Sequence, residues 1–272
     1  MIRSNVHKYS VSALCKCLGV ARSTYYYSPV SKDHDLQAEI DVEKVFRENR
    51  SVYGSRKIKV ALKRKGIVLS RRRISKIMSK LDLHSAYTCR KFKVHKAKPI
   101  DTEVPNELNR VFNGHSEYAA IVSDLTYVRV NYKWNYICIL LDLFNREIIG
   151  YSAGPYKDAQ LVLDAFATVP AALDKIQLFH TDRGSEFNNN LIDEVLDTFD
   201  ITRSFSLKGC PYDNSVAEST FKSIKAEFVY RHHFSSLSEL RVQLSDFVHW
   251  FNTQRIHSTL GYLSPSEYKA ST

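Results

Sequence analysis

Long apolar runs are missing from this chain of 272 residues, and its N-terminus lacks the apolar stretch of a secretory signal. A membrane helix needs roughly 20 consecutive apolar residues, and no segment approaches that length. We therefore expect no membrane segment and a cytoplasmic location. The hydrophobic content of 44% is enough for a substantial core, which predicts one large or two small globular domains.

Cysteine is scarce, and its positions form no metal-binding pattern. The five cysteines include no Cys-x-x-Cys pair, and no histidine pair stands at the spacing of a zinc site. We therefore expect reduced thiols and no zinc-binding N-terminal domain. Internal repeats, low-complexity tracts and a heptad array are missing as well.

Acidic residues are few in the first part of the chain. Residues 1–111 carry 25 Lys and Arg against 10 Asp and Glu, a net charge of +15, whereas residues 112–272 carry 14 against 19, a net charge of −5. A polyanion is the expected partner of the first part, because neutralising nucleic-acid phosphates releases counterions. A basic surface that is merely solvated is the alternative, and the helical pattern of the same segment argues against it.

The basic part has the pattern of several short helices. Helices are expected over residues 12–18 and from about residue 22, on either side of a turn at Gly19, and their spacing fits a helix-turn-helix. Two more are expected over 35–48 and 56–65. Residues 1–88 are therefore predicted to form an all-α, basic DNA-binding region of the helix-turn-helix type.

A further helix is predicted over residues 71–81, with Ser70 as its N-cap and an apolar stripe on one side. Four basic side chains lie largely outside the stripe and are predicted to contact the backbone or a groove of DNA: Arg72, Arg73, Lys76 and Lys80. The alternative for each of them is an ordinary solvated helix face. Residues 89–112 lose the apolar periodicity and remain basic, which predicts a linker that follows phosphates.

Residues 113–272 have the pattern of a mixed α/β domain. Three strand-like runs come first, separated by two segments suited to hairpin turns, and are followed by alternating helices and strands. The predicted elements are strands over 118–130, 134–144 and 147–153, a helix over 158–173, a strand over 176–180, a helix over 190–199, a strand over 201–206, and helices over 215–230 and 238–252. This order implies a mixed sheet flanked by helices.

Three carboxylates stand in or next to these elements. Asp124 lies in the first strand-like run, Asp182 follows the fourth, and Glu218 opens a helix 35 intervening residues later. Three carboxylates from separate elements can hold two Mg²⁺ ions, which is the equipment of in-line phosphoryl transfer. The chain has 29 acidic residues, so the prediction depends on the three together and on their surroundings.

Those surroundings resemble the OrfB-type transposases of the insertion-sequence-three family, relatives of retroviral integrases with a D,D,35,E signature. The resemblance lies in four blocks in the family's order: Ser123–Val128, His180–Phe187, Lys208–Glu218 and Trp250–Tyr262. Ser215 stands where the family commonly has Ala, and Ile121 and Val122 stand where a Trp is frequent. Neither departure affects a carboxylate.

The resemblance implies a ribonuclease-H-like fold, in which the first and fourth strands are neighbours and bring Asp124 beside Asp182. It implies a transposase that cleaves the ends of an insertion sequence and joins the freed 3′-OH to target DNA. The expected cofactor is two Mg²⁺ ions, with Mn²⁺ as a substitute. Asp124 is expected to bridge them, with Asp182 on one ion and Glu218 on the other.

Several polar residues near the carboxylates are candidate DNA contacts. Lys222 and Lys225 follow Glu218 by four and seven residues and so share its helical face, where they are predicted to hold phosphates of the DNA end. A solvent-facing pair that shields Glu218 is the alternative. Lys208 and Asn214 border the same loop and are predicted to contact DNA or to position Glu218.

Some motif residues have roles that the sequence leaves open or assigns to structure. For Asn252, Arg255 and His257 of the C-terminal block, helix packing and DNA contact both remain open. Asp142 has no partner motif, so a structural role is expected. His180, which precedes the second aspartate by two residues, is either a supporting residue of the site or a turn-stabilising one.

The partner implied is double-stranded DNA, both element ends and target, in the bacterial nucleoid. The resemblance also implies an OrfA partner or fusion, and it implies a homo-oligomer on DNA because two ends must be held together. Two other functions remain. A hydrolytic nuclease of the same fold would share the carboxylates but would not account for the basic helices, and a noncatalytic DNA-binding protein would not need the carboxylates.

Overall fold

The computed structural model describes residues 2–27, 32–87, 105–207 and 210–272. The predicted linker lies largely outside this range, and so does Lys208. Three short helices come first, α1 (Ile2–Asn5), α2 (Val11–Cys17) and α3 (Arg22–Tyr26). The turn between α2 and α3 contains Gly19 with a φ of 64°, a backbone conformation that glycine adopts without strain. The helix-turn-helix spacing expected here is therefore present.

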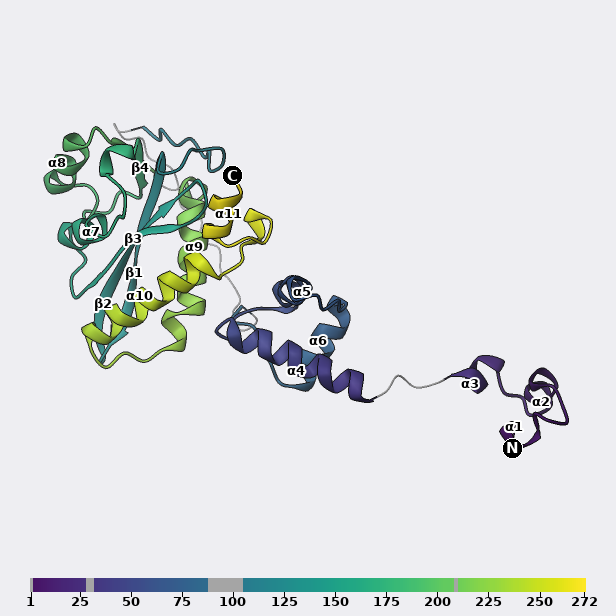
Figure 1. Ribbon diagram of the computed structural model, residues 1–272. Helices are drawn as coiled ribbons and strands as arrows, with labels where there is room; N and C mark the ends of the chain where they lie inside the picture. The colour runs from purple at the N-terminus through teal and green to yellow at the C-terminus, as the bar shows by residue number, and fades with distance from the viewer. Residues whose placement is uncertain (1, 28–31, 88–104, 208–209) are drawn as a thin grey trace.

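A second helical group follows (Figure 1), made of α4 (Lys32–Glu48), α5 (Ser55–Arg64) and α6 (Arg71–Lys80). The Ser70 side chain accepts a hydrogen bond from the Arg73 backbone N–H at 3.2 Å, which confirms the predicted N-cap of α6. Ile74, Ile77 and Met78 are buried, which confirms the apolar stripe on this helix.

Helices α4 to α6 dock against the C-terminal part of the chain. The Tyr53 hydroxyl donates to the Gln254 carbonyl at 3.3 Å and accepts from the Ile256 N–H at 2.9 Å. Arg64 forms an ion pair of 3.0 Å with Glu267. The apolar residues of α4 to α6 also belong to the same hydrophobic cluster as those of two C-terminal helices, α9 (Ser215–Glu227) and α10 (Leu237–Thr253).

Five strands form one mixed sheet in the order β3-β2-β1-β4-β5. Their bounds are β1 (Ala120–Val130), β2 (Lys133–Asp142), β3 (Ile148–Gly154), β4 (Leu178–Thr181) and β5 (Thr202–Phe205). The first three strands are antiparallel neighbours, and β4 is parallel to β1 and to β5. This confirms the ribonuclease-H-like order of elements. Asn131 and Tyr132 both have positive φ, as a tight hairpin turn between β1 and β2 requires.

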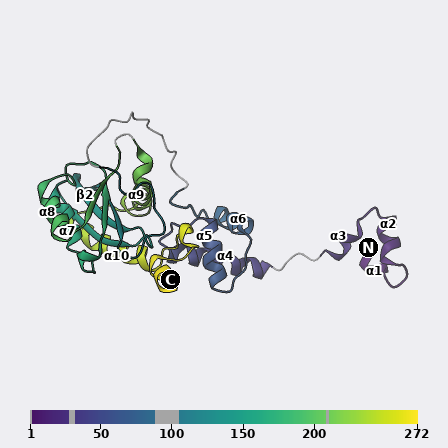
Figure 2. The same ribbon diagram turned by 90° about the horizontal axis from the view of Figure 1, so that it is seen from above.

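Helices cover both faces of the sheet (Figures 1 and 2). Helices α7 (Ala159–Phe166) and α8 (Asn190–Thr198) lie on one face, and α9 and α10 lie on the other. Alternate residues of β1 point to opposite faces, so that Ile121 packs in the α7 and α8 cluster and Val122 in the α9 and α10 cluster. The sheet is thereby buried on both sides.

Two helices end earlier than predicted, α4 begins three residues earlier than predicted, and α1 and α11 were not predicted. The helix expected over 158–173 ends at Phe166, shortly before Pro170, which has no N–H to continue a helix. The helix expected to reach residue 230 ends at Glu227. The unpredicted helix α11 (Pro265–Ser271) begins with a capping box between Ser264 and Glu267.

The sequence predicts reduced cysteines and no membrane helix. Four of the five cysteines lie in the described ranges, and all four are free thiols. No helix found there is long and apolar enough to cross a membrane.

Candidate active site

Two of the predicted carboxylates lie on neighbouring central strands. Val122 of β1 is paired in register with His180 of β4, and the two strands are parallel. Asp124 and Asp182 each lie two residues beyond this pair, so the topology brings them to the same end of the sheet. Asp182 immediately follows the last residue of β4, and its Oδ1 accepts a hydrogen bond of 2.9 Å from the Gly184 N–H.

Glu218 approaches the same place from the first turn of α9. Helix α9 lies against β1, and the Lys225 ammonium stands 5.2 Å from the centre of the Tyr127 ring. Lys222 forms an ion pair of 3.4 Å with Glu218, and the glutamate side chain is 40% exposed. The structure therefore places Glu218 and both predicted lysines on one helix beside β1.

Burial and neighbouring charges shift the pKa of Asp124. Burial raises the pKa of Asp124 to about 7, and the hydrogen bond from the Leu125 N–H partly opposes this. The charge of Asp182 raises the pKa further, the charge of Lys225 lowers it, and the charge of Glu218 raises it again. Two other carboxylates therefore lie close enough to disfavour a charge on Asp124.

The side chains of Asp124, Asp182 and Glu218 are the candidate ligands of a metal ion. Within the described parts of the chain, no three or more His, Cys, Asp or Glu side chains are gathered closely enough to form a ready metal cluster. The donors nevertheless suit a hard divalent cation, since all three are carboxylates. A cation between them would also favour the ionised form of Asp124, which burial and its neighbours disfavour.

A fourth carboxylate near the site was missed from the sequence. Glu186 is 3% exposed and pairs with Lys157 at 2.8 Å. The hydrogen bond to Glu186 raises the pKa of Lys157, as do the charges of Glu186, Asp182 and Asp124. A Cβ on Gly184 would stand 2.4 Å from a Glu186 oxygen, so this glycine leaves room for the carboxylate. The acid four residues after Asp182 was the available signal.

The loop before α9 holds two polar residues that matter for the position of Glu218. Asn214 is buried at the N-cap of α9, and its Oδ1 has no hydrogen-bond partner among the residues that the structure describes. The neighbouring Asp213 pairs with Arg110 at 2.6 Å and accepts from the Leu207 N–H at 3.0 Å. Asp213 therefore anchors the loop, while the predicted role of Asn214 stays a prediction.

The four basic residues predicted on α6 differ in their surroundings. Arg72 and Lys76 are exposed, and Arg73 is half-buried. Lys80 donates to Glu39 of α4 at 2.6 Å, so this lysine joins two helices of the protein. DNA contact by any of the four stays a prediction.

Asn252 and Arg255, whose roles the sequence left open, both pack inside the protein. The Asn252 side chain accepts from the Ile148 N–H at 3.0 Å and donates to the Ile148 carbonyl at 2.9 Å, which fixes α10 to β3. Arg255 is buried and donates to Glu227 through two nitrogens, each at 2.7 Å. His257 stacks edge-on against Phe251, and burial together with the charge of Arg255 holds its pKa well below the usual range.

Asp142 and His180 have structural partners as well. Asp142 accepts hydrogen bonds of 2.9 Å from the N–H groups of Tyr118 and Phe144, in agreement with its expected structural role. The two ring nitrogens of His180 lie 2.8 Å from Ser204 Oγ and 3.0 Å from Ser206 Oγ. His180 thus joins β4 to β5 and to the residue that follows β5.

Comparison with known proteins places this geometry in a family. Family profiles described as "Integrase core domain" match residues 114–211 and 218–272, and a profile described as "HTH-like domain" matches residues 32–92. The putative transposase InsK for insertion sequence element IS150 of Escherichia coli K12 is 28% identical over 97% of this chain and 95% of its own length.

Two further known proteins are similar to this chain. The transposase InsF for insertion sequence IS3A of Escherichia coli K12 is 28% identical over 98% of this chain and 96% of its own length. Among solved structures, the catalytic core domain of HTLV-2 integrase in complex with magnesium is 15% identical, with a TM-score of 0.45 over 56% of this chain and 96% of that chain.

Proposed function

Because this chain belongs to the integrase-core transposases of insertion sequences, we propose that it cuts the ends of its element and joins each freed 3′-OH to target DNA. In the joining step the 3′-OH oxygen forms a bond to a target phosphorus, and the bond from that phosphorus to its own 3′ oxygen breaks. The hydroxyl proton leaves with the attack, and the departing 3′ oxygen takes one up. The number of phosphodiesters is conserved, so the step needs no energy-rich co-substrate.

One observation carries the proposal, namely the convergence of Asp124, Asp182 and Glu218 from β1, the end of β4 and the start of α9. We assign Asp124 as the shared ligand, Asp182 to one metal position and Glu218 to the other. Two Mg²⁺ or Mn²⁺ ions, when bound, supply charge neutralisation of the phosphodiester and activation of the attacking oxygen. Asp124 then stays ionised, although it is partly buried.

The basic residues of α9 are proposed to orient the DNA. Lys222 and Lys225 lie on the helical face that carries Glu218, and Lys222 is already within 3.4 Å of that carboxylate. Each ammonium is a compact point charge that suits a phosphate oxygen. Together with Asn214, and with Lys208 outside the described residues, they would hold the terminal phosphates in line with the attack.

The remaining assignments follow from the DNA substrate. We propose that residues 1–88 bind DNA, that 89–112 link them, and that 113–272 catalyse. We also propose that two copies act together on paired ends, that an OrfA partner or fusion supplies further DNA specificity, and that the protein works in the cytoplasm at the nucleoid. The basic excess of residues 1–111, 25 against 10, supports the first of these assignments.

The test is cleavage and joining of a labelled duplex that carries the end of the element, with and without Mg²⁺. We expect joined products from the wild type and none from Glu218→Gln. A matched control is Glu194→Gln, an exposed glutamate on α8, which should leave joining unchanged. Nicking without joining would favour a hydrolytic nuclease, and DNA binding without any cleavage by the wild type would favour a noncatalytic protein.

A further inference from the structure

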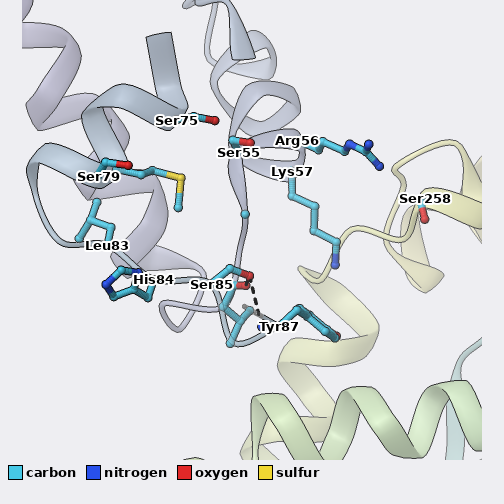
Figure 3. A pocket seen from close by; sticks show the side chains of 13 residues that line it. Ser55, Arg56, Lys57, Ser75, Ser79, Leu83, His84, Ser85, Tyr87 and Ser258 are labelled. Carbon is cyan, nitrogen blue, oxygen red and sulfur yellow. Dashed lines mark hydrogen bonds between the residues drawn. The ribbon is translucent and has the colours of Figure 1, made fainter. Parts of the chain in front are cut away.

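Two cavities meet where α5 and α6 dock against the C-terminal part of the chain. One has a volume of about 770 Å³ and lies between α5, α6 and the segment that ends at Tyr87. The other has a volume of about 230 Å³ and lies between α9 and the segment after α10. Lys57 and Ser258 line both cavities, so the two lie side by side, and we call them together the Lys57 groove. Figure 3 shows Lys57 and Arg56 extending from α5 toward the segment that carries Ser258.

The lining of the Lys57 groove has charges of one sign. Four cationic side chains contribute to it, and among the described residues no aspartate or glutamate lines either cavity. The four are Arg56, Lys57, Arg146 and Arg255. Arg255 is neutralised by Glu227, which lies behind it. Arg146 donates to the carbonyls of Leu143 and Phe112 and to the Asn113 side chain, and Asp142 is the carboxylate whose charge acts on it.

Lys57 is half-buried, and the protein offers its ammonium little compensation. Among the described contacts its ammonium has a single neighbour, the Tyr53 ring, whose centre lies 5.0 Å away, and it forms no ion pair there. Burial lowers the pKa of Lys57 to about 7, the charge of Arg255 lowers it further, and the charge of Glu227 acts in the opposite direction. A partly buried ammonium in positive surroundings is stabilised by an anion from outside.

Helix α9 supplies the polar wall that an anion would need. Ser219, Thr220 and Ser223 line the smaller cavity, while Glu218, Lys222 and Lys225 belong to a different face of the same helix. Positions 219, 220 and 223 fall on a side roughly opposite to 218, 222 and 225 at 3.6 residues per turn. One helix thus separates the carboxylate site from the Lys57 groove.

We propose that the Lys57 groove binds a backbone phosphate of duplex DNA, with Lys57 as the principal contact, on the side of α9 that faces away from the active site. This inference rests on the proposed function, since it supposes that DNA is the substrate. Hydroxyl groups and cations without carboxylates are the usual contacts of the DNA backbone, which fix position rather than read sequence. The phosphate can come from the element end or from the target duplex.

Fluorescence anisotropy of the full chain tests the site with two labelled duplexes, one carrying the element end and one of unrelated sequence. Lys57→Gln should weaken binding about tenfold and reduce the slope of log affinity against log salt by about one. Lys59→Gln is the matched control, because Lys59 is an exposed lysine on the same helix. A loss confined to the element-end duplex assigns the groove to the end, and a loss for both duplexes assigns it to any backbone, target included.

A second variant guards against misfolding of the first. Ser258 is exposed and lines both cavities, so Ser258→Asp places a negative charge in the Lys57 groove without disturbing the core. We expect Ser258→Asp to weaken binding at least as much as Lys57→Gln, and Ser258→Ala to bind like the wild type. The contrast between Asp and Ala separates charge from shape.

The pH dependence gives an independent readout. DNA bound at Lys57 favours the ammonium, so wild-type affinity should fall as pH rises through about 7, and Lys57→Gln should lose that part of the dependence. Burial raises the pKa of Tyr53 and of Tyr87 to about 12 and holds that of His257 well below its usual range, so these three groups do not change charge near pH 7. Arg255 and Glu227 remain an ion pair. Arg56, Arg146 and His84 also line the Lys57 groove, and they are the same in the wild type and in Lys57→Gln, so the difference between the two pH profiles reports on Lys57.

The outcomes separate this inference from the proposed function. If Lys57→Gln and Ser258→Asp both bind duplexes like the wild type, the Lys57 groove holds no phosphate, while Mg²⁺-dependent joining by the wild type still supports a transposase. If the wild type binds neither duplex, both proposals fail. A loss of binding in both variants, with Lys59→Gln unaffected, establishes the site.

Discussion

Glu218 and Glu227 lie at opposite ends of α9, and their charges have different surroundings. Glu227 is buried and receives two hydrogen bonds of 2.7 Å from Arg255, so its charge is neutralised within the protein. Glu218 contacts Lys222 at 3.4 Å, and its charge raises the pKa of Asp124. The charge of Glu227 is thus compensated within the protein, whereas the raised pKa of Asp124 beside two other carboxylates supports the proposed cation site.

The largest effect should come from Asp124→Asn. We expect strand joining to fall about a thousandfold, since an amide cannot supply the negative charge that two cations require. Thermal stability should stay the same or rise, because the variant no longer holds a carboxyl close to two others. Joining rates and the melting temperature of the same preparation provide the check.

Asp142→Asn is the matched control for that variant. Asp142 is also an aspartate of a central strand, but it accepts two backbone hydrogen bonds of 2.9 Å. This control should lower stability and leave joining per folded molecule nearly unchanged. A fall in melting temperature for Asp124→Asn as large as that of the control would assign Asp124 to structure.

The next largest effect should come from Glu227→Gln. Removing one partner leaves Arg255 buried without its counter-charge, which costs about 3 to 5 kcal/mol of unfolding free energy. Urea denaturation measures this loss. Replacing both Glu227 and Arg255 by Met should recover much of it, because an apolar pair leaves no charge behind. If the double variant is as unstable as Glu227→Gln, the effect lies in shape and not in charge.

Lowering the pH should also weaken the pair of Glu227 and Arg255, with a smaller loss of stability than the substitution causes. Burial acts to raise the pKa of Glu227, but the charge of Arg255 overcomes it and lowers the pKa below the usual 4.5. The stabilisation is therefore complete above about pH 4.5 and is lost as pH falls through the lower folded value. Urea midpoints measured from about pH 6 to about pH 3.5 should fall more steeply for the wild type than for Glu227→Gln. Parallel curves would contradict a lowered pKa.

The contrast between the two glutamates also shows what the sequence could predict. The place of Glu218 at the start of a helix was predictable from the residues around it, and the order of elements along the chain follows from alternating apolar runs and short turns. The pairing of Glu227 with Arg255 joins residues 28 positions apart without a repeating pattern, and the docking of Tyr53 on Ile256 spans 203 positions. Such contacts depend on the packing of whole elements.

Local signals were also missed where they were present. Pro170 marks the early end of α7, and the run Ser264, Pro265, Ser266, Glu267 is a helix start with a capping box. Glu186 lies in the Asp182 motif, but its burial against Lys157 could be known only from the folded structure. A buried acid cannot be told from an exposed one by its position in a motif.

The smallest expected effect distinguishes Lys76 from Lys80, two lysines of α6 for which the sequence predicts the same DNA contact. Lys80 pairs with Glu39 at 2.6 Å, whereas Lys76 is exposed one turn away. Lys76→Gln should weaken binding to duplexes of any sequence and reduce the salt slope by about one, because it removes a cation available to phosphates. Lys80→Gln should change DNA affinity less and stability by at most about 1 kcal/mol, since an exposed ion pair contributes little. Anisotropy titrations over a range of salt, together with urea midpoints, measure both quantities. Equal losses of affinity in the two variants would mean that Lys80 leaves Glu39 to contact the DNA. An ion pair in the free protein would then not distinguish a structural lysine of α6 from a DNA-binding one.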